Sequence, residues 1–590
     1  MFFHLNVLKK HWPIFLTGIF LTLLVSLPVI LFPFFAHDSY QGINIAHFGT
    51  DAHYYLTRGK EILEGHGLGN IILREGKDMQ EPQFTYVEYV LLLPLRAFGM
   101  SHKIDIVTLY NVYNFIGVLM LILMVYFFAL ELKDNRWFAT AASLFVVGGY
   151  SIIYNKTIGS PELNIYGRAI FPYVSSLVFF NFARLLLRSL KYNHWKKTIW
   201  AGVSFGVLFY IFFYAWSFAL ALLGSLFIVY LVKKDFISVK KLVVISSIGL
   251  ALGAYNLIRL LSFYNSEHGR QLGFFLWSYT SHTPIMSKIG LVMIVVLGVY
   301  LYRQRGDSNM AVIIGFMLAG WIALNQQIFS GHVIQYGHYY WFFIVPTSII
   351  LSIYMIWSLL KNDRWRIICS VALVLIVFVN SGIGQYRATF TYLDSKKDEQ
   401  RYRPILTVLQ KEQTSSVVMA PDNASGLLIT IYTSHDLLWN GTALVYNTPL
   451  ERMEETLVWY LYLNKESRST PRPYLEQALA NSGNASESKM LYVAIEGLTS
   501  GWDSHVYDAK VLSKDFSLFD HRRQLLDRVE KNYRRITADP QYVASFLEKY
   551  GVSYIVWDKV FNPEWDLTIF PRLQLLVQSE RVGLYIVTQR

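Results

Sequence analysis

The stretch Thr50-Asp51-Ala52-His53-Tyr54-Tyr55-Leu56 follows the first long apolar segment and opens a long polar region. If it is helical, Asp51, Tyr54 and Tyr55 share one face, because residues three and four positions apart are neighbours on a helix surface. The stretch therefore predicts a carboxylate beside two aromatic rings at the edge of a membrane. The alternative is that Asp51 only stabilises a helix N-terminus, where acidic side chains are favoured.

The composition indicates an α-helical polytopic membrane protein. Of its 590 residues, 53% are hydrophobic and 16% are charged, against about 25% charged in a typical soluble domain. A membrane helix needs roughly 20 apolar residues, and the sequence holds about eleven such segments by this measure. They cover residues 12–35, 106–130, 137–154, 167–187, 198–214, 216–232, 242–263, 288–302, 310–328, 339–360 and 367–386.

Basic residues determine the predicted orientation. The net charge is +12, and much of the excess lies in short loops, for example at Lys9-Lys10 and Lys233-Lys234. Cytoplasmic loops of membrane proteins are rich in Lys and Arg, so the charge does not call for a nucleic-acid partner. We expect a plasma (inner) membrane protein with a cytoplasmic N-terminus. The lone cysteine, Cys369, excludes disulfides and cysteine metal sites.

This orientation places residues 36–105 in one large external loop, provided that Phe84–Met100 does not cross the membrane. That segment contains Glu88, Pro94 and Arg96, so we expect it to lie as a helix on the outer surface. The orientation also requires that residues 198–232 cross twice, with a break near Tyr214-Ala215-Trp216.

Hydrophobicity falls after about Gly384. The sequence therefore divides into a transmembrane domain, 1–386, and a soluble α/β domain, 387–590, on the extracytoplasmic side. Its expected helices are Leu450–Leu463 and Pro540–Tyr550, and its expected strands are Val417–Ala420, Lys489–Ile495, Val552–Trp557 and Arg581–Thr588.

This order of elements resembles the GT-C superfamily of integral membrane glycosyltransferases, which includes oligosaccharyltransferases, protein mannosyltransferases and aminoarabinose transferase-like enzymes. The shared pattern is one span, a large external loop opening with Asp-x-x-Tyr-Tyr/Phe-Leu, a flat helix, many spans and an outer domain. By this resemblance Asp51 matches the superfamily's catalytic base, or an acid that holds the acceptor or a metal. Asp38 is the alternative, because it lies nearer the end of the first span.

The second external loop resembles oligosaccharyltransferases less closely. Tyr154-Asn155-Lys156-Thr157 is similar to their Tyr-Asn-Arg-Thr stretch, but Glu162-x-Asn164 replaces the metal-binding Asp-x-Asp that follows it there. One acid in place of two weakens metal binding, because hard cations prefer charged oxygen ligands. No metal is then obligatory, although Asp51 and Glu162 could share Mg²⁺ or Mn²⁺. The chain also lacks the Trp-Trp-Asp-Tyr-Gly motif of those enzymes, which argues against an asparagine acceptor.

Further candidates for substrate binding accompany Tyr54 and Tyr55. Arg168, at the start of a span, could bind a lipid phosphate through its planar donors. The alternative is that its side chain only snorkels to the membrane interface. Arg270 lies among aromatic residues in loop 264–287, where it could bind a pyrophosphate or belong to an interfacial belt. His332 and His338 lie in loop 329–340, which by the resemblance contacts the lipid phosphate.

We therefore expect an inverting glycosyltransferase of the hexosyl or pentosyl class. The resemblance implies a polyprenyl-phosphate-linked sugar donor, a glycan, lipid or protein acceptor, and surrounding membrane lipids; Asp51 would deprotonate the acceptor. The alternative is a transporter or flippase of a lipid-linked glycan, which needs no base. A scaffold subunit would leave Asp51 without a role. Phosphate-loop and His-Glu-x-x-His motifs are absent from the sequence, so an ATP-driven pump or ordinary hydrolase is not favoured.

Overall fold

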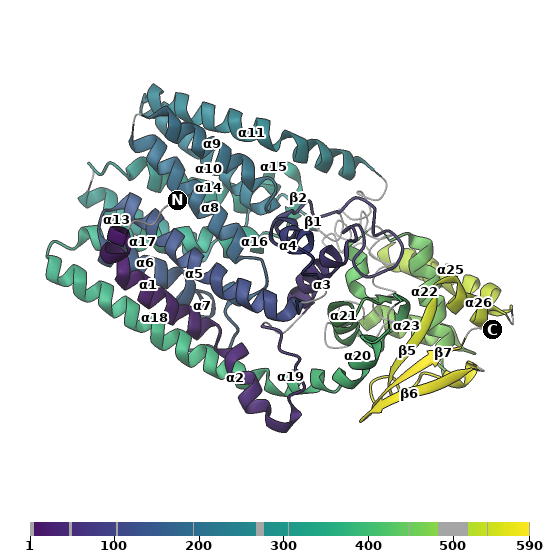
Figure 1. The fold of residues 1–590 in the computed structure, drawn as a ribbon. Coiled ribbons are helices and arrows are strands. Elements are labelled where there is room, and N and C mark those ends of the chain that lie inside the picture. Colours follow the sequence, from purple (N-terminus) through teal and green to yellow (C-terminus); the bar gives the residue numbers. More distant parts are fainter. Residues whose placement is uncertain are drawn as a thin grey trace.

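A computed structural model shows a helical bundle joined to a smaller domain that carries the C-terminus (Figure 1). The structure describes residues 5–46, 50–101, 104–192, 194–266, 277–304, 306–412, 414–446, 448–481, 517–539, 541–570 and 572–588.

Every segment predicted to span the membrane is largely helical. The bundle helices are α1 (Leu5–Val25), α2 (Leu27–Ala36), α5 (Ile106–Leu132), α6 (Arg136–Gly148), α7 (Tyr150–Asn155), α8 (Tyr173–Lys191), α9 (Trp195–Leu208), α10 (Phe213–Val232), α11 (Phe236–Asn265), α13 (Lys288–Arg303), α14 (Met310–Leu324), α15 (Gln327–Ser330), α16 (Gly337–Tyr339), α17 (Val345–Leu359) and α18 (Asp363–Thr391). A π-helical turn, η3 (Tyr340–Ile344), joins α16 to α17. Within the described residues, six helices are long and apolar enough to cross a membrane, or seven if α1 and α2 count as one bent span. These helices support an integral membrane protein, while the number of about eleven spans stays a prediction.

Residues 198–232 form two helices, but the break lies slightly earlier than Tyr214-Ala215-Trp216. Helix α9 ends at Leu208 and α10 begins at Phe213. Other parts of the chain bind the freed carbonyls: the Tyr86 N–H donates to the Tyr210 oxygen at 3.0 Å, and Asn256 Nδ2 donates to the Phe209 oxygen at 2.5 Å. A helix inside a bundle can be interrupted where protein groups satisfy its backbone in this way.

Residues 36–105, which are predicted to form the first external loop, contain α3 (Thr50–Glu64) and α4 (Val87–Ala97). The helix expected within Phe84–Met100 is therefore present, and its 11 residues are too few to cross a bilayer. Its Glu88 is fully buried and binds Arg58 of α3. Helix α4 is thus attached to α3 by a buried ion pair as well as by apolar contacts.

The C-terminal region is a mixed α/β structure, as expected. A five-stranded sheet has the order β4-β3-β5-β7-β6; β3 is parallel to β4 and β5, and β7 is antiparallel to β5 and β6. The strands are β3 (Val417–Met419), β4 (Asp436–Leu437), β5 (Val552–Asp558), β6 (Leu573–Ser579) and β7 (Val582–Val587). The helices are α19 (Leu393–Gln400), α20 (Arg403–Leu409), α21 (Asn423–Tyr432), α22 (Leu450–Leu463), α23 (Pro471–Asn481), α25 (Ser517–Thr537) and α26 (Tyr542–Lys549).

Most expected elements of this region are confirmed. Helix α22 has the predicted bounds, and β3, β5 and β7 lie where strands were expected. Strands β4 and β6 were not predicted. The predicted strand Lys489–Ile495 lies outside the described residues.

The molecule has two large hydrophobic cores. One lies inside the helical bundle, and the other joins the first external loop to the C-terminal region. Thr57 of α3 and Thr430 of α21 exchange a hydrogen bond of 2.9 Å within this second core, and Figure 1 shows α3 and α4 between the bundle and the sheet. The domain boundary at 386/387 stays a prediction; α18 itself continues to Thr391.

Candidate functional site

Asp51 forms an ion pair with Arg168. Asp51 lies in the first turn of α3, and its side chain is 63% exposed. Arg168 follows the short turn η2 (Ile165–Gly167) in the second external loop, and its side chain is 16% exposed. The fold therefore brings together a carboxylate and a guanidinium that were singled out separately.

The backbone before Arg168 is held from two sides. Asn114 Nδ2 of α5 donates to the Gly167 carbonyl at 3.2 Å, and Asn164 Oδ1 accepts from the Tyr166 N–H at 2.9 Å. The Nε of Arg168 is buried and has no hydrogen-bond partner among the described residues. An unpaired buried donor is costly, so this guanidinium has binding capacity that the protein itself does not use.

His338 lies within electrostatic range of both members of the pair. Its ring stacks on Tyr214 at a centroid distance of 4.6 Å and meets Phe212 edge-on at 5.7 Å. Its Nδ1 lies 3.2 Å from the Gln335 carbonyl oxygen. If Nδ1 carries the proton and donates to this carbonyl, Nε2 is the acceptor nitrogen of the neutral ring.

The two tyrosines of α3 have different surroundings. Tyr55 contacts Phe171 at a ring distance of 5.4 Å, and Phe171 stacks on Phe212 at 4.7 Å. An aromatic chain thus connects α3 to His338. Tyr54 is 9% exposed and instead accepts a hydrogen bond of 2.9 Å from the Tyr446 hydroxyl, in the second core. Burial raises the pKa of both Tyr54 and Tyr55 above the usual value, so both stay neutral phenols at physiological pH.

Among the described residues, no contact joins the ion pair to Asp38 or Glu162. Asp38 is exposed in the short turn η1 (His37–Ser39) after α2. His332 lies in β2 (His332–Ile334), which pairs with β1 (Trp277–Thr280) and so joins loops 264–287 and 329–340. Arg270 lies outside the described residues. Glu162 accepts a hydrogen bond of 2.9 Å from Asn155 Nδ2 and lines a pocket with Tyr154.

The residues around Asp51 do not fit Mg²⁺ or Mn²⁺ well. These cations need several oxygen ligands, whereas the Asp51 carboxylate already holds a guanidinium and Glu162 holds an amide. Across the described ranges, Glu61, Glu64 and His66 are the one group of at least three His, Cys, Asp or Glu residues whose ligand atoms lie within 4.8 Å of one another. Neither Asp51 nor Glu162 belongs to it.

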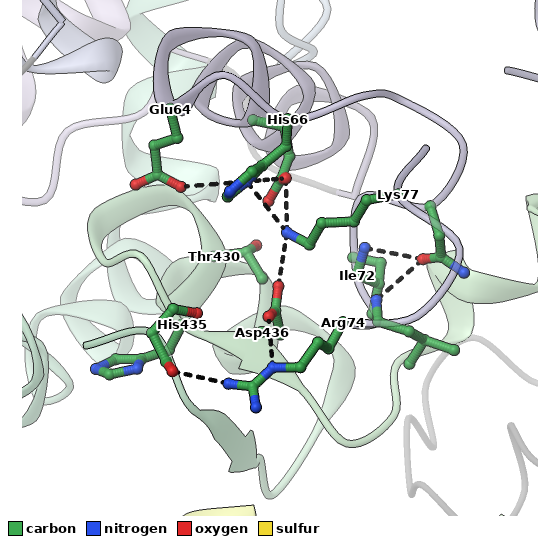
Figure 2. A network of polar contacts seen from close by, with 12 residues as sticks. Glu64, His66, Ile72, Arg74, Lys77, Thr430, His435 and Asp436 are labelled. Carbon is green, nitrogen blue, oxygen red and sulfur yellow. Dashed lines mark hydrogen bonds and ion pairs between the residues drawn. The ribbon is translucent and has the colours of Figure 1, made fainter. Parts of the chain in front are cut away.

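The group at Glu61 is part of a polar network between the external loop and the C-terminal region (Figure 2). Lys77 Nζ lies 2.6 Å from Glu61 Oε2 and 2.7 Å from Asp436 Oδ1, while Arg74 lies 3.5 Å from the other oxygen of Asp436. The ammonium of Lys77 neutralises Glu61, so the network serves to attach the two parts. No local sequence signal indicated it, because Lys77 and Asp436 are far apart in the chain.

No family model matches the sequence, and no curated protein matches it. Solved structures are similar in overall fold. ArnT from Cupriavidus metallidurans, bound to undecaprenyl phosphate, matches with a TM-score of 0.48 and 13% identity over 96% of this chain and 98% of that one. The Archaeoglobus fulgidus oligosaccharyltransferase tethered with an acceptor peptide matches with a TM-score of 0.45 and 12% identity, over 99% of this chain and 75% of that one. Archaeal oligosaccharyltransferase AglB from Archaeoglobus fulgidus, in complex with an inhibitory peptide and a dolichol-phosphate, matches with a TM-score of 0.43 and 12% identity, over 99% of this chain and 75% of that one. The similarity to these structures concerns the fold alone.

Proposed function

We propose that the protein is a membrane glycosyltransferase that moves a sugar from a polyprenyl-phosphate carrier to an acceptor on the outer side of the membrane. The observation that carries this proposal is the Asp51–Arg168 ion pair at the exposed start of α3, within electrostatic range of His338. Sugar transfer from a phosphate needs a base for the acceptor and a cation for the leaving group. The ion pair supplies one group of each kind.

In the proposed reaction, the acceptor hydroxyl oxygen attacks C1 of the sugar on the face opposite to the phosphate. The bond from C1 to the phosphate oxygen breaks, and the phosphate leaves with the electron pair. Asp51 takes the proton of the acceptor, and the configuration at C1 is inverted. Arg168 binds the departing phosphate through its planar donors, including the Nε that has no partner among the described residues.

The ion pair has to open for this reaction. Arg168 exchanges the carboxylate of Asp51 for the phosphate of the carrier, which leaves Asp51 free to accept a proton. The exposure of Asp51 makes this exchange inexpensive, because exposed ion pairs contribute only about 0–1 kcal/mol. The carrier proposed here is of the class named with ArnT and AglB, undecaprenyl phosphate and dolichol phosphate respectively.

The test compares Asp51→Asn with the wild-type protein in lipid nanodiscs, using polyprenyl-phosphate-linked hexoses and pentoses as donors. Loss of the base is expected to reduce transfer by about 10²-fold or more. Asp38→Asn is the matched control, since Asp38 is another exposed acid near the same span, and it is expected to keep wild-type activity.

Two results would contradict this assignment. Unchanged transfer by Asp51→Asn, with loss in Asp38→Asn, would move the base to Asp38. Lipid scrambling in vesicles without transfer from any donor would instead favour the transporter or flippase.

A further inference from the structure

A pocket of about 130 Å³ lies between α6–α7, the second external loop and α18. A water molecule takes about 30 Å³ of liquid, and pockets for drug-sized ligands measure about 300–1,000 Å³. The pocket therefore has room for one small ring rather than an extended ligand. Its walls include Tyr150, Tyr154, Glu162 and Trp341.

Aromatic rings form one corner of this pocket. Tyr154 stacks on Tyr150 at 6.0 Å with an interplanar angle of 14°, and it meets Trp341 edge-on at 5.9 Å and 85°. Tyr154 is nevertheless 47% exposed. Two ring systems at a right angle provide apolar faces on which the C–H groups of a ring-shaped ligand can pack.

Amide side chains keep the pocket in shape. Asn380 of α18 accepts from the Gly159 N–H at 2.8 Å and donates to the Gly148 carbonyl at 2.7 Å. Gln385 accepts from the Asn164 N–H at 3.1 Å and donates to the Glu162 carbonyl at 2.8 Å. These hydrogen bonds fix the external loop against α18, so the pocket is pre-formed rather than assembled by its ligand.

The Glu162 carboxylate at the pocket has hydrogen-bonding capacity left. Among the described residues, Asn155 is the hydrogen-bond donor to this exposed carboxylate, which can accept several more. A ligand with hydroxyl groups would use this capacity.

The charge of the pocket selects against a phosphate. Its wall contains the carboxylate of Glu162 and no Lys or Arg among the described residues that line it. The carrier phosphate is assigned to Arg168. The donor sugar is bonded directly to this phosphate, so it has to stay beside Arg168. A carboxylate with aromatic faces suits instead a neutral ring that donates hydrogen bonds.

A short segment of the chain connects the pocket to the ion-pair site. His338, which is within electrostatic range of Asp51 and Arg168, is followed three residues later by Trp341 in the pocket wall. Both belong to the helical turns α16 and η3. We propose that this pocket binds one uncharged sugar ring of the acceptor, so that the acceptor is a glycan. The assignment of that ring to the acceptor rests on the proposed function.

Direct binding tests the pocket without requiring catalysis. The protein is placed in nanodiscs, free of sugar-headed detergents, and titrated with the methyl glycosides of glucose, galactose and mannose, with saturation-transfer NMR as the readout. At least one glycoside is expected to give ring-hydrogen signals. Tyr154→Ala and Glu162→Gln should each weaken binding by about tenfold, which corresponds to losing one strong contact. Tyr302→Ala removes an exposed tyrosine of α13 and should change nothing.

The outcomes separate this proposal from the proposed function. Absence of signal with all three glycosides, or binding that neither variant weakens although both melt like the wild type, would overturn the pocket assignment. In a transfer assay, Glu162→Gln should raise the KM for the acceptor and leave kcat and the donor KM unchanged. Sugar binding that depends on the pocket, in a protein without transfer activity, would refute the proposed glycosyltransferase function but support the sugar-binding pocket.

Discussion

Helix α3 carries two arginine–carboxylate clusters with opposite surroundings. Near its middle, Arg58 is fully buried; its Nε lies 2.6 Å from Glu88 and its Nη2 lies 2.5 Å from Glu81. Nη2 also donates to the Thr85 hydroxyl at 2.8 Å. At its start, Asp51 is 63% exposed and binds Arg168, whose Nε has no partner in the described part of the chain.

The difference separates a structural cluster from a reactive one. Burying a charge is tolerated only when its partners compensate the lost hydration, and Arg58 has two carboxylates and a hydroxyl around it. Such a cluster cannot exchange a partner without a large loss of stability. In the Asp51–Arg168 pair, Asp51 is open to solvent and Arg168 is incompletely bonded, so a substrate can replace either partner.

The largest expected effect comes from breaking the buried cluster. Arg58→Met removes the guanidinium and leaves Glu81 and Glu88 buried without a counter-ion, which should cost about 3–5 kcal/mol of unfolding free energy. Thermal and denaturant unfolding in nanodiscs measure it. Arg534→Met is the control, because Arg534 forms an exposed ion pair with Glu530 and should cost at most about 1 kcal/mol. Equal effects of the two variants would contradict the structural role of Arg58.

Removing the guanidinium of Arg168 should affect activity instead. Arg168→Gln is expected to raise the KM for the polyprenyl-phosphate donor by about tenfold, because the phosphate loses a charged, planar partner. Its melting temperature should stay near the wild-type value, since exposed pairs contribute little. Arg168→Lys keeps the charge but not the planar donors, so its KM for the donor should fall between the values for the wild type and for Arg168→Gln. A loss of stability as large as that of Arg58→Met would remove the distinction between the clusters.

A smaller, pH-dependent effect concerns Lys396, which helps to hold the chain leading to Asp51. Lys396 is buried, and its Nζ donates to the Ile45 carbonyl at 2.9 Å rather than to a carboxylate. Burial lowers its pKa to about 8, from 10.5. At pH values between these two pKa values, the unfolded chain binds more protons than the folded one. The free energy of unfolding should therefore rise with pH, by at most about 1.4 kcal/mol per pH unit.

Comparing melting temperatures at pH 7.5 and 9.5 tests this prediction through the difference between variants. Lys396→Met should lose the rise that the wild type shows, whereas Lys411→Met, at an exposed lysine, should keep it. A Lys396→Met variant with the same pH profile as the wild type would show that the buried ammonium is not titrating in this range.

Features that depend on neighbouring residues were predicted well. Continuous apolar segments indicated the bundle helices, and the acidic first half of Leu450–Leu463 indicated α22. Glu88, Pro94 and Arg96 indicated that α4 does not cross. The break between α9 and α10 was placed slightly late, because it depends on distant donors, the Tyr86 N–H and the Asn256 amide.

The candidate site was predicted only in part. Asp51, Arg168, Glu162 and His338 were singled out one by one from local patterns. Their arrangement was not: Asp51 pairs with Arg168, while Glu162 belongs to a separate pocket. Tyr54, expected on the same face as Asp51, lies in the second core because the C-terminal region covers that part of α3.

A helical membrane protein with an α/β region, and an acid after its first apolar segment, can be read from the sequence alone. Hydrophobic length, charge and helix periodicity are local properties, so one sequence is enough to reveal them. Only the tertiary structure decided which charges meet, because Asp51 and Arg168 are 117 positions apart and Arg58 reaches Glu88 across a turn of the external loop. Solvent exposure, which distinguishes the pair at Asp51 from the buried cluster at Arg58, is likewise set by the packing of distant segments.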